Sequence, residues 1–349
     1  MIRMKENNNL PEEKYIPRHA STYGYNKVKE NIELDSEDTS SDEELELEEK
    51  YYKIDKNIDI EKELDNINDT IEPKVVKKKK RKLKRWVWIF FLVIFISIII
   101  FSSIKIIFWV KDNKKTSDTV NNINKITNIE EKKDDENTEL VNEPEDKSED
   151  NDYWYYIKFP LINVDINALK SKNNDTIGWI NVNNTNINYP YVQGKDNGYY
   201  LTHSYDKSYN EAGWVFLDYR NSSTLSDKNN ILYAHSRLDK TMFGSLSKTL
   251  KSNWYNNKDN HIIRLSTESE NTMWQIFSVY KIPEESYYIT TNFNTDSEYE
   301  TFLNTIKERS IHNFNTTLTV EDKILTLSTC YSDTERTVVH AKLIKRSSR

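Results

Sequence analysis

Apolar residues are concentrated in two parts of this 349-residue chain, and each part has its own pattern. Residues 86–104 are an uncharged run of Trp, Phe, Ile, Leu and Val with three serines, and apolar residues continue past Lys105 to Val110. From about residue 153 onward, short β-branched or aromatic runs are separated by clusters of Asn, Asp and Ser. The first pattern is typical of one long helix in lipid, and the second is typical of strands joined by turns.

The continuous apolar run predicts a transmembrane helix over residues 86–110. About 20 residues, at about 1.5 Å each, span a hydrocarbon core of about 30 Å. Trp86, Trp88 and Trp109 stand where interfacial aromatic residues are expected. A cleaved signal peptide fits less well, because such peptides begin the chain and end in small residues. Nine basic residues within 74–85 precede the span, which predicts a single-pass cell-membrane protein with a cytoplasmic N-terminus and an extracytoplasmic C-terminal part.

The segments that flank this span are polar and lack a regular period. Residues 1–73 hold 21 acidic and 10 basic side chains, so we expect a disordered acidic cytoplasmic tail. Residues 74–85 form a basic juxtamembrane segment; the adjacent span argues against a nucleic-acid partner. Residues 111–152 are mixed in charge and predict a flexible extracytoplasmic stalk. The tail suggests either a cytoplasmic partner or an extension without a defined role.

The block from residue 153 to 349 is expected to be one globular, mostly β domain of the barrel or sandwich type. Two helices are predicted, at 243–255 and 298–309, the second with apolar residues at i, i+3, i+4 and i+7 and a capping box from Ser297 to Glu300. A short helical turn is expected at 165–170. The strand-like runs are 213–219, 230–235, 261–265, 273–280, 324–330 and 337–344.

The chain contains one cysteine, Cys330, which excludes an internal disulfide framework and any multi-thiolate metal site. An isolated cysteine is most often a small buried hydrophobe. Cys330, however, ends a strand-like run beside a polar stretch, and a nucleophilic thiolate is commonly paired with a histidine. His235 ends its own strand-like run in the same way. Arg336 follows Cys330 closely and is either a surface charge or a donor for an oxyanion.

The other histidines outside the expected span fit a solvated or structural role better. They are His203, His261, His312 and His340, and the last lies inside a terminal strand-like run. The residues therefore favour a cysteine and histidine pair, with Arg336 as a third member, as the candidate chemistry of the domain.

Several segments resemble the sortases, membrane-anchored cysteine transpeptidases of Gram-positive bacteria. Residues 326–330 are similar to the TLxTC signature of that family, and residues 233–235 followed by 241–243 are similar to its histidine segment. A longer string resembles class B sortases in particular, and the likeness extends over about residues 160–346. Its segments are 178–180, 189–197, 200–201, 218–221 and 338–342.

This resemblance implies a closed sortase β-barrel with peripheral helices, including one between strands 6 and 7. It implies that Cys330 is the nucleophile, His235 the general acid and Arg336 the oxyanion or carbonyl ligand. Cleavage of a C-terminal sorting motif in secreted proteins would form a Cys thioester, which a peptidoglycan-precursor or pilin amine resolves. No cofactor and no metal are expected. The residues implied to line the substrate groove are Asn197, Leu201, Tyr233, Tyr288, Ile289 and Ser328.

Two departures from the family pattern stand out. The connection between Cys330 and Arg336 holds five residues and is short, and the cytoplasmic tail is long. Other interpretations are an L,D-transpeptidase or papain-like peptidase, whose nucleophiles stand in other settings, and a catalytically quiet membrane-anchored module that binds peptides or signals through a sortase-like barrel.

Overall fold

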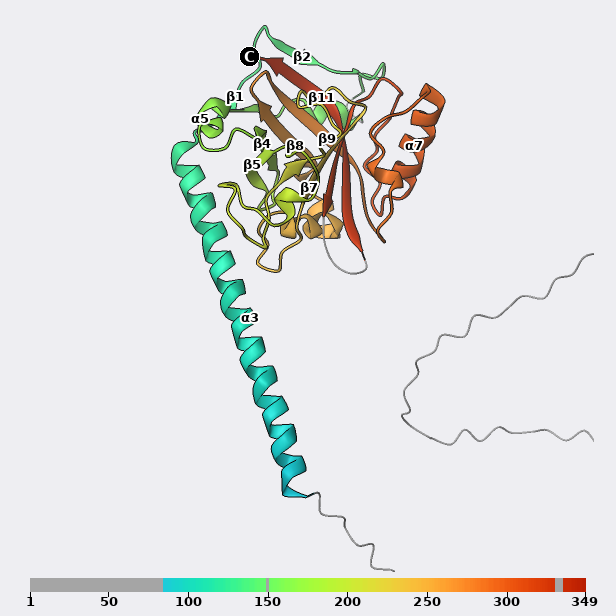
Figure 1. Cartoon of the computed structure of the whole chain (residues 1–349). Helices are drawn as coiled ribbons and strands as arrows, with labels where there is room; N and C mark the ends of the chain where they lie inside the picture. The colour runs from blue at the N-terminus through green and yellow to red at the C-terminus, as the bar shows by residue number, and fades with distance from the viewer. Residues whose placement is uncertain (1–83, 149–150, 330–334) are drawn as a thin grey trace, which may run out of the picture. The chain divides into compact units, whose positions relative to one another are not determined.

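The computed structural model describes residues 84–148, 151–329 and 335–349 (Figure 1). Its central element is a closed barrel of eight strands, in the order β10-β7-β6-β5-β4-β8-β9-β11, and a pairing of β11 with β10 closes the ring. The expected mostly β class and closed barrel are therefore confirmed. The barrel strands are β4 (Thr176–Val182), β5 (Asn188–Val192), β6 (Phe216–Leu217), β7 (Asn229–Ala234), β8 (Ile262–Thr267), β9 (Glu270–Ile282), β10 (Ile324–Thr329) and β11 (Arg336–Ser348).

The interior of the barrel is filled by apolar side chains from many of its strands. Trp179, Phe216, Leu232, Leu327 and Val339 are all buried in one continuous cluster. Alternate residues of each strand point inward, so every strand contributes every second side chain to this core. Closure also leaves the barrel without free strand edges along its circumference.

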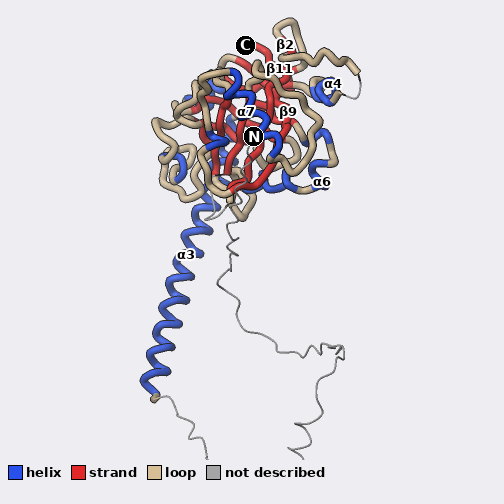
Figure 2. The backbone as a smooth tube through the Cα atoms, turned by 90° about the vertical axis from the view of Figure 1, so that its right-hand side faces the viewer, coloured by secondary structure: helices blue, strands red, loops and turns tan. Residues whose placement is uncertain are grey.

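Helix α7 (Asp296–Glu308) lies between β9 and β10, the sixth and seventh barrel strands in chain order, which is the position the family resemblance implies. Its buried face packs against β9 and β11 (Figures 1 and 2). The expected capping box is displaced by two residues: Thr295, not Ser297, is the N-cap, and its hydroxyl accepts from the backbone N–H of Glu298 at 3.1 Å. The inward-facing residues of α7 are Tyr299, Phe302, Leu303 and Ile306.

The remaining short helices surround the barrel (Figure 2). The turn expected at 165–170 is present, with the Asp165 side chain capping α5. The helix expected at 243–255 is instead divided, because Lys251 is extended between two short helical segments. The helices are α4 (Asp152–Tyr156), α5 (Ile166–Lys170), η1 (Tyr199–Leu201), η2 (Gly244–Leu250), α6 (Ser252–Tyr255), η3 (Lys258–Asn260) and η4 (Tyr287–Ile289).

Two of the differences between the expected and observed strands occur at glycines, whereas β5 is a further strand that the expected runs did not include. The expected strand 213–219 is reduced to β6, because Gly213 has a φ of +60° and turns the chain just before it. Strand β4 escaped prediction because Gly178 interrupts its β-branched pattern. A Cβ at Gly178 would lie 2.5 Å from the carbonyl oxygen of Ser266, so the close packing of β4 on β8 requires glycine there.

Helix α3 (Arg85–Ile126) is continuous through the predicted span and beyond it. Its apolar first part, residues 86–110, is exposed in the structure and is long and apolar enough to cross a membrane by length and composition. The second part packs on the barrel domain, where Thr116 and Ile123 are buried. Helical structure therefore extends 16 residues past the predicted end of the span.

The expected flexible stalk at 111–152 is corrected for its described residues. After α3, β1 (Ile129–Lys132) pairs with β3 (Leu161–Val164), and β2 (Thr138–Leu140) adds to the edge of β11. The buried ammonium of Lys345 also holds the connection between β1 and β2, since it donates to both carboxylate oxygens of Asp134, at 2.8 and 3.1 Å. Polar composition concealed this order, because strand pairing and a few buried contacts, not a large apolar face, hold the segment.

Candidate active site

The candidate site is built where β7 and β10 end side by side. These strands are parallel, and the last pair in their register joins Ala234 to Thr329. His235 is the residue that follows Ala234, and Cys330 is the residue that follows Thr329 in the sequence. Cys330 itself lies outside the described residues. The register brings the chain positions that precede the two candidate residues to the same end of the barrel.

Arg336 begins β11, which runs antiparallel to β10. The backbone N–H of Thr337 donates to the hydroxyl of Thr329 at 2.9 Å, so the first residues of β11 lie beside the last residues of β10. The guanidinium of Arg336 is 2.9 Å from the Glu284 carboxylate, whose side chain is 81% exposed. Ion pairs with such exposed partners contribute little stability, about 0–1 kcal/mol. Arg336 can therefore exchange this partner for a ligand at low cost.

The His235 ring is held by a backbone contact. Its Nε2 lies 2.7 Å from the carbonyl oxygen of Leu201, which can only accept, so Nε2 carries the proton. Gly213 allows this arrangement, because a Cβ there would lie 2.5 Å from the Tyr200 carbonyl oxygen and 3.1 Å from the His235 ring. The half-buried ring also lines a cavity of about 330 Å³. The histidine is thus oriented and remains open to a ligand.

Three of the implied substrate-lining residues meet near this end of the barrel. Leu201 contacts His235 through its backbone carbonyl. The hydroxyls of Tyr288 and Ser328 are 3.0 Å apart, and both side chains are buried. Ser328 stands two residues before Cys330, so a strand continuing to that position would present both on one face.

A buried carboxylate, that of Asp218 just after β6, holds the implied substrate residue Tyr233 on the neighbouring strand β7. Tyr233 donates its hydroxyl to Asp218 at 3.0 Å, and Arg220 donates to both oxygens of the same carboxylate, at 2.9 and 2.6 Å. Burial raises the pKa of Asp218, but the hydrogen bonds and charge of Arg220 outweigh it and keep that pKa below its ordinary value. The pair is therefore ionised and geometrically fixed.

The same arginine reaches Ile289, and Tyr219, the residue before the arginine, contacts Asn197. Arg220 donates to the backbone carbonyl of Ile289 at 3.0 Å, and the amide oxygen of Asn197 accepts from the backbone N–H of Tyr219 at 3.0 Å. Sequence reasoning gave no role to Asp218 or Arg220. The signal was present in the class-B-like segment 218–221, where an acid and a base stand two residues apart at the end of a strand.

The other described histidines have structural surroundings. His203 stacks on Tyr199 with ring centroids 4.0 Å apart. Burial lowers the pKa of His261 to about 4 and that of His340 to about 3. His312 stacks on Tyr255 at 4.4 Å. Each of these four rings therefore has a local partner within the described part of the chain.

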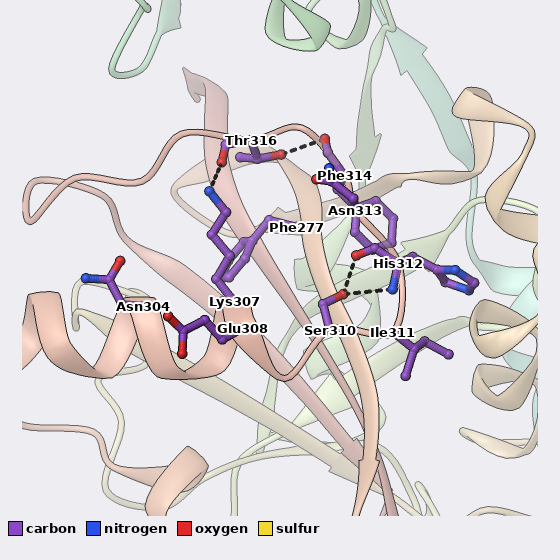
Figure 3. A pocket seen from close by; sticks show the side chains of 10 residues that line it. All are labelled: Phe277, Asn304, Lys307, Glu308, Ser310, Ile311, His312, Asn313, Phe314 and Thr316. Carbon is purple, nitrogen blue, oxygen red and sulfur yellow. Dashed lines mark hydrogen bonds between the residues drawn. The ribbon is translucent and has the colours of Figure 1, made fainter.

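A second cavity, of about 560 Å³, lies between the end of α7 and the chain that follows it (Figure 3). Its polar groups are largely occupied by local contacts. Lys307 donates to the backbone carbonyl of Thr316 at 2.6 Å, and the Ser310 hydroxyl donates to the carbonyl of His312 at 2.7 Å. None of the predicted site residues lines this cavity, so the His235 end of the barrel remains the better candidate site.

Comparison with known proteins agrees with this fold and arrangement. Residues 180–344 match the sortase domain family. Sortase B of Staphylococcus aureus is 39% identical over 184 residues, covering 52% of this chain and 75% of that protein. Sortase B of Listeria monocytogenes is 36% identical over 190 residues, with the same two coverages. The chain belongs to the sortase family.

Solved structures place it more narrowly. A crystal structure of a Bacillus anthracis protein similar to sortase B superimposes with a TM-score of 0.53 at 35% identity, covering 68% of this chain and 97% of that one. A sortase B crystal structure complexed with triglycine gives 0.50 at 38% identity, covering 52% and 85%. The protein is accordingly a class B sortase, an enzyme of the cysteine transpeptidase type.

Proposed function

We propose that this sortase cleaves a C-terminal sorting motif of secreted proteins with Cys330 as nucleophile, His235 as general acid and Arg336 as oxyanion or carbonyl ligand. The observation that carries the proposal is the parallel register of β7 and β10, which ends at Ala234 and Thr329, the residues immediately before His235 and Cys330. The start of β11 beside Thr329 supports the assignment of Arg336.

The reaction that this set of residues supports has two halves. The Cys330 thiolate attacks the carbonyl carbon of the scissile peptide bond, the C–N bond breaks, and His235 gives its proton to the leaving amine. The incoming amine then attacks the thioester, the C–S bond breaks, and His235 recovers a proton from that amine. Arg336 stabilises the oxyanion in both halves, because its planar fork can donate two parallel hydrogen bonds.

The groove is proposed to consist of Asn197, Leu201, Tyr233, Tyr288, Ile289 and Ser328. Most of these residues are connected through Asp218 and Arg220 or through direct contacts, which supports one preorganised surface. The acceptor is proposed to be an amine of a peptidoglycan precursor or a pilin. Support for an amine comes from the sortase B relative that was crystallised with triglycine.

We further propose that α3 anchors the enzyme in the cell membrane with the N-terminus in the cytoplasm. The exposed apolar residues 86–110 support an anchor, and the basic residues before them support this orientation. A cytoplasmic partner of the acidic tail stays a prediction, since residues 1–73 lie outside the described part of the chain.

A thiol-directed test distinguishes this enzyme from a quiet peptide-binding module. The full chain and its Cys330→Ala variant are divided into two reactions: one is treated with a thiol-reactive probe, and the other, left unlabelled, is incubated with a library of sorting peptides and triglycine. We expect labelling, peptide cleavage and a triglycine-joined product in the wild type, and none of these in the variant. Peptide binding without cleavage by the wild type would support the module. The full chain is required because β1 and β2 pair with strands of the catalytic domain.

A further inference from the structure

Helix α3 does more than anchor the domain, because it is fixed to the loop that carries His235. The side chain of Arg237 donates to the amide oxygen of Asn113 on α3. One helical turn further, the Thr116 hydroxyl accepts from Asn210 at 3.0 Å, and both residues are fully buried. The helix then packs along the domain as far as Ile123, which is 4% exposed within the core.

These contacts fix the position of the barrel relative to α3, and therefore its distance from the apolar segment of that helix. Trp109 is one of the last residues of the apolar run, and Asn113 follows it by four residues, a rise of about 6 Å. Contacts from residue 113 to residue 123 clamp about another 15 Å of helix against the domain. A domain held in this way cannot swing away from the apolar segment as it would on a flexible stalk.

The clamp places the loop after β7 beside the end of the apolar run. Trp109 lines the same cavity as His235, Arg237 and Leu238. Leu238, at the loop tip, is 87% exposed, whereas the Arg237 side chain is 11% exposed and also pairs with Asp239 at 3.6 Å. Arg237 thus holds the loop against α3, and Leu238 is the apolar side chain that the loop exposes to its surroundings.

We propose that the tip of the His235 loop is a second membrane contact, in which Leu238 inserts beside Trp109 among the lipid headgroups. The inference rests on the proposed membrane span of α3. Tryptophan at the end of a span lies at headgroup level, and residues that share its cavity lie at that level too. Lys111, Lys114 and Lys240 are exposed nearby and can face phosphate groups.

The consequence concerns access to the site. A cavity that contains both His235 and Trp109 opens at the membrane surface, so a substrate or acceptor still attached to the membrane reaches it without extending far from the bilayer. An acceptor amine on a lipid-linked carrier would therefore meet the enzyme at a fixed height. This contact is a property of the folded chain and does not require the thiol.

The test measures the depth of single spin labels in the full chain, reconstituted in vesicles of phosphatidylglycerol and phosphatidylcholine. Cys330→Ala removes the native thiol, and cysteines are placed in turn at Leu238, at Phe95 within the span and at Ile311. The last position is a matched control, because Ile311 is also an exposed aliphatic residue, 54% exposed, and lies after α7. Collision with oxygen reports lipid, and collision with a water-soluble nickel complex reports solvent.

We expect position 95 to report the bilayer interior, position 311 to report water, and position 238 to show a ratio of oxygen to nickel collisions several-fold above that at 311. A value at 238 equal to that at 311 overturns the inference, even when position 95 lies in lipid and the span stands. Water-like values at both 95 and 238 reject the span and this contact together.

A second pair of variants tests whether Arg237 holds the loop against α3. Arg237→Gln should release the loop and bring the collision ratio at 238 toward that at 311. The matched control is Arg264→Gln, since Arg264 also donates to asparagine side chains, at 3.0 and 2.9 Å, but on β8. An equal change with both variants would contradict the role of Arg237.

Discussion

His235, at the end of a barrel strand, and His340, inside another, have contrasting surroundings. His235 follows the last residue of β7, is half-buried, and makes a hydrogen bond to a backbone carbonyl beside a cavity. His340 lies within β11, is fully buried, and has hydroxyl partners at both ring nitrogens, Tyr280 and Thr326, each at 2.8 Å. A difference of position along a strand thus separates a histidine that lines a cavity from one that is fixed inside the barrel.

The hydrogen bonds of His340 determine its protonation. Thr326 donates its hydroxyl proton to Asn229 at 2.6 Å, so its oxygen must accept from Nδ1–H of His340. Nε2 then accepts from Tyr280. The ring is therefore neutral, in agreement with the lowered pKa that burial causes. A ring with both nitrogens committed inside the barrel has no proton to exchange with a substrate, whereas the half-buried ring of His235 lines a cavity.

The largest effect is expected from His235→Ala. Removing the proposed general acid should lower kcat/KM for sorting-peptide cleavage by about 10²–10⁴-fold, because proton transfer contributes that much to such reactions. The free energy of unfolding should change little, since the ring is only half-buried and lies beside a cavity. Peptide cleavage and urea unfolding are measured on the same preparation. Full activity in this variant would remove His235 from the mechanism.

Next in size is Arg336→Lys. We expect a loss of about 10²-fold in kcat, comparable to the loss of one oxyanion donor, because an ammonium lacks the planar fork of a guanidinium. Single-turnover cleavage separates this effect from a change in KM. A variant with normal kcat would show that only positive charge is needed, and a variant with raised KM alone would assign Arg336 to substrate binding.

His340→Leu should have the opposite effects to His235→Ala: a lower free energy of unfolding with little change in kcat/KM. It leaves the hydroxyls of Tyr280 and Thr326 without their buried partner, at a cost of about 1–3 kcal/mol for each unsatisfied group. Urea unfolding should detect this loss, while kcat/KM of the folded fraction stays near that of the wild type. A large loss of kcat/KM in fully folded protein would contradict the separation of the two histidines.

The buried histidines also predict how stability depends on pH. His261 and His340 have folded pKa values of about 4 and 3, below the ordinary value of 6.5, so the unfolded chain binds protons that the folded chain does not. Their stabilising contribution is complete above pH 6.5. Below it, the free energy of unfolding should fall by up to about 1.4 kcal/mol per pH unit for each ring.

Urea titrations between pH 7.5 and 5 measure this slope, and His340→Leu serves as its control. In that variant the free energy of unfolding should change less steeply with pH, because one of the two titrating rings is absent. Identical slopes in the variant and the wild type would mean that His340 is protonated or exposed in the folded chain.

The sequence predicted most of the barrel and its helix α7, because strand alternation and helical periodicity are local properties. It did not predict the order of residues 111–148, which depends on pairing with β3 and β11 far along the chain. Nor did it assign Asp218 and Arg220, whose importance arises only when Tyr233 and Ile289 meet them in three dimensions. The roles proposed for Cys330, His235 and Arg336 stay predictions.

The smallest expected effect concerns the ion pair at the start of β11. Glu284→Gln removes the exposed partner of Arg336. Because exposed pairs contribute about 0–1 kcal/mol, kcat/KM should rise by no more than about five-fold, if Glu284 competes with the substrate carbonyl for the guanidinium. Raising the ionic strength should reduce the difference between variant and wild type. A large loss of activity would instead mean that Glu284 positions Arg336. Arg336 would then be a side chain held by a required partner, as His340 is.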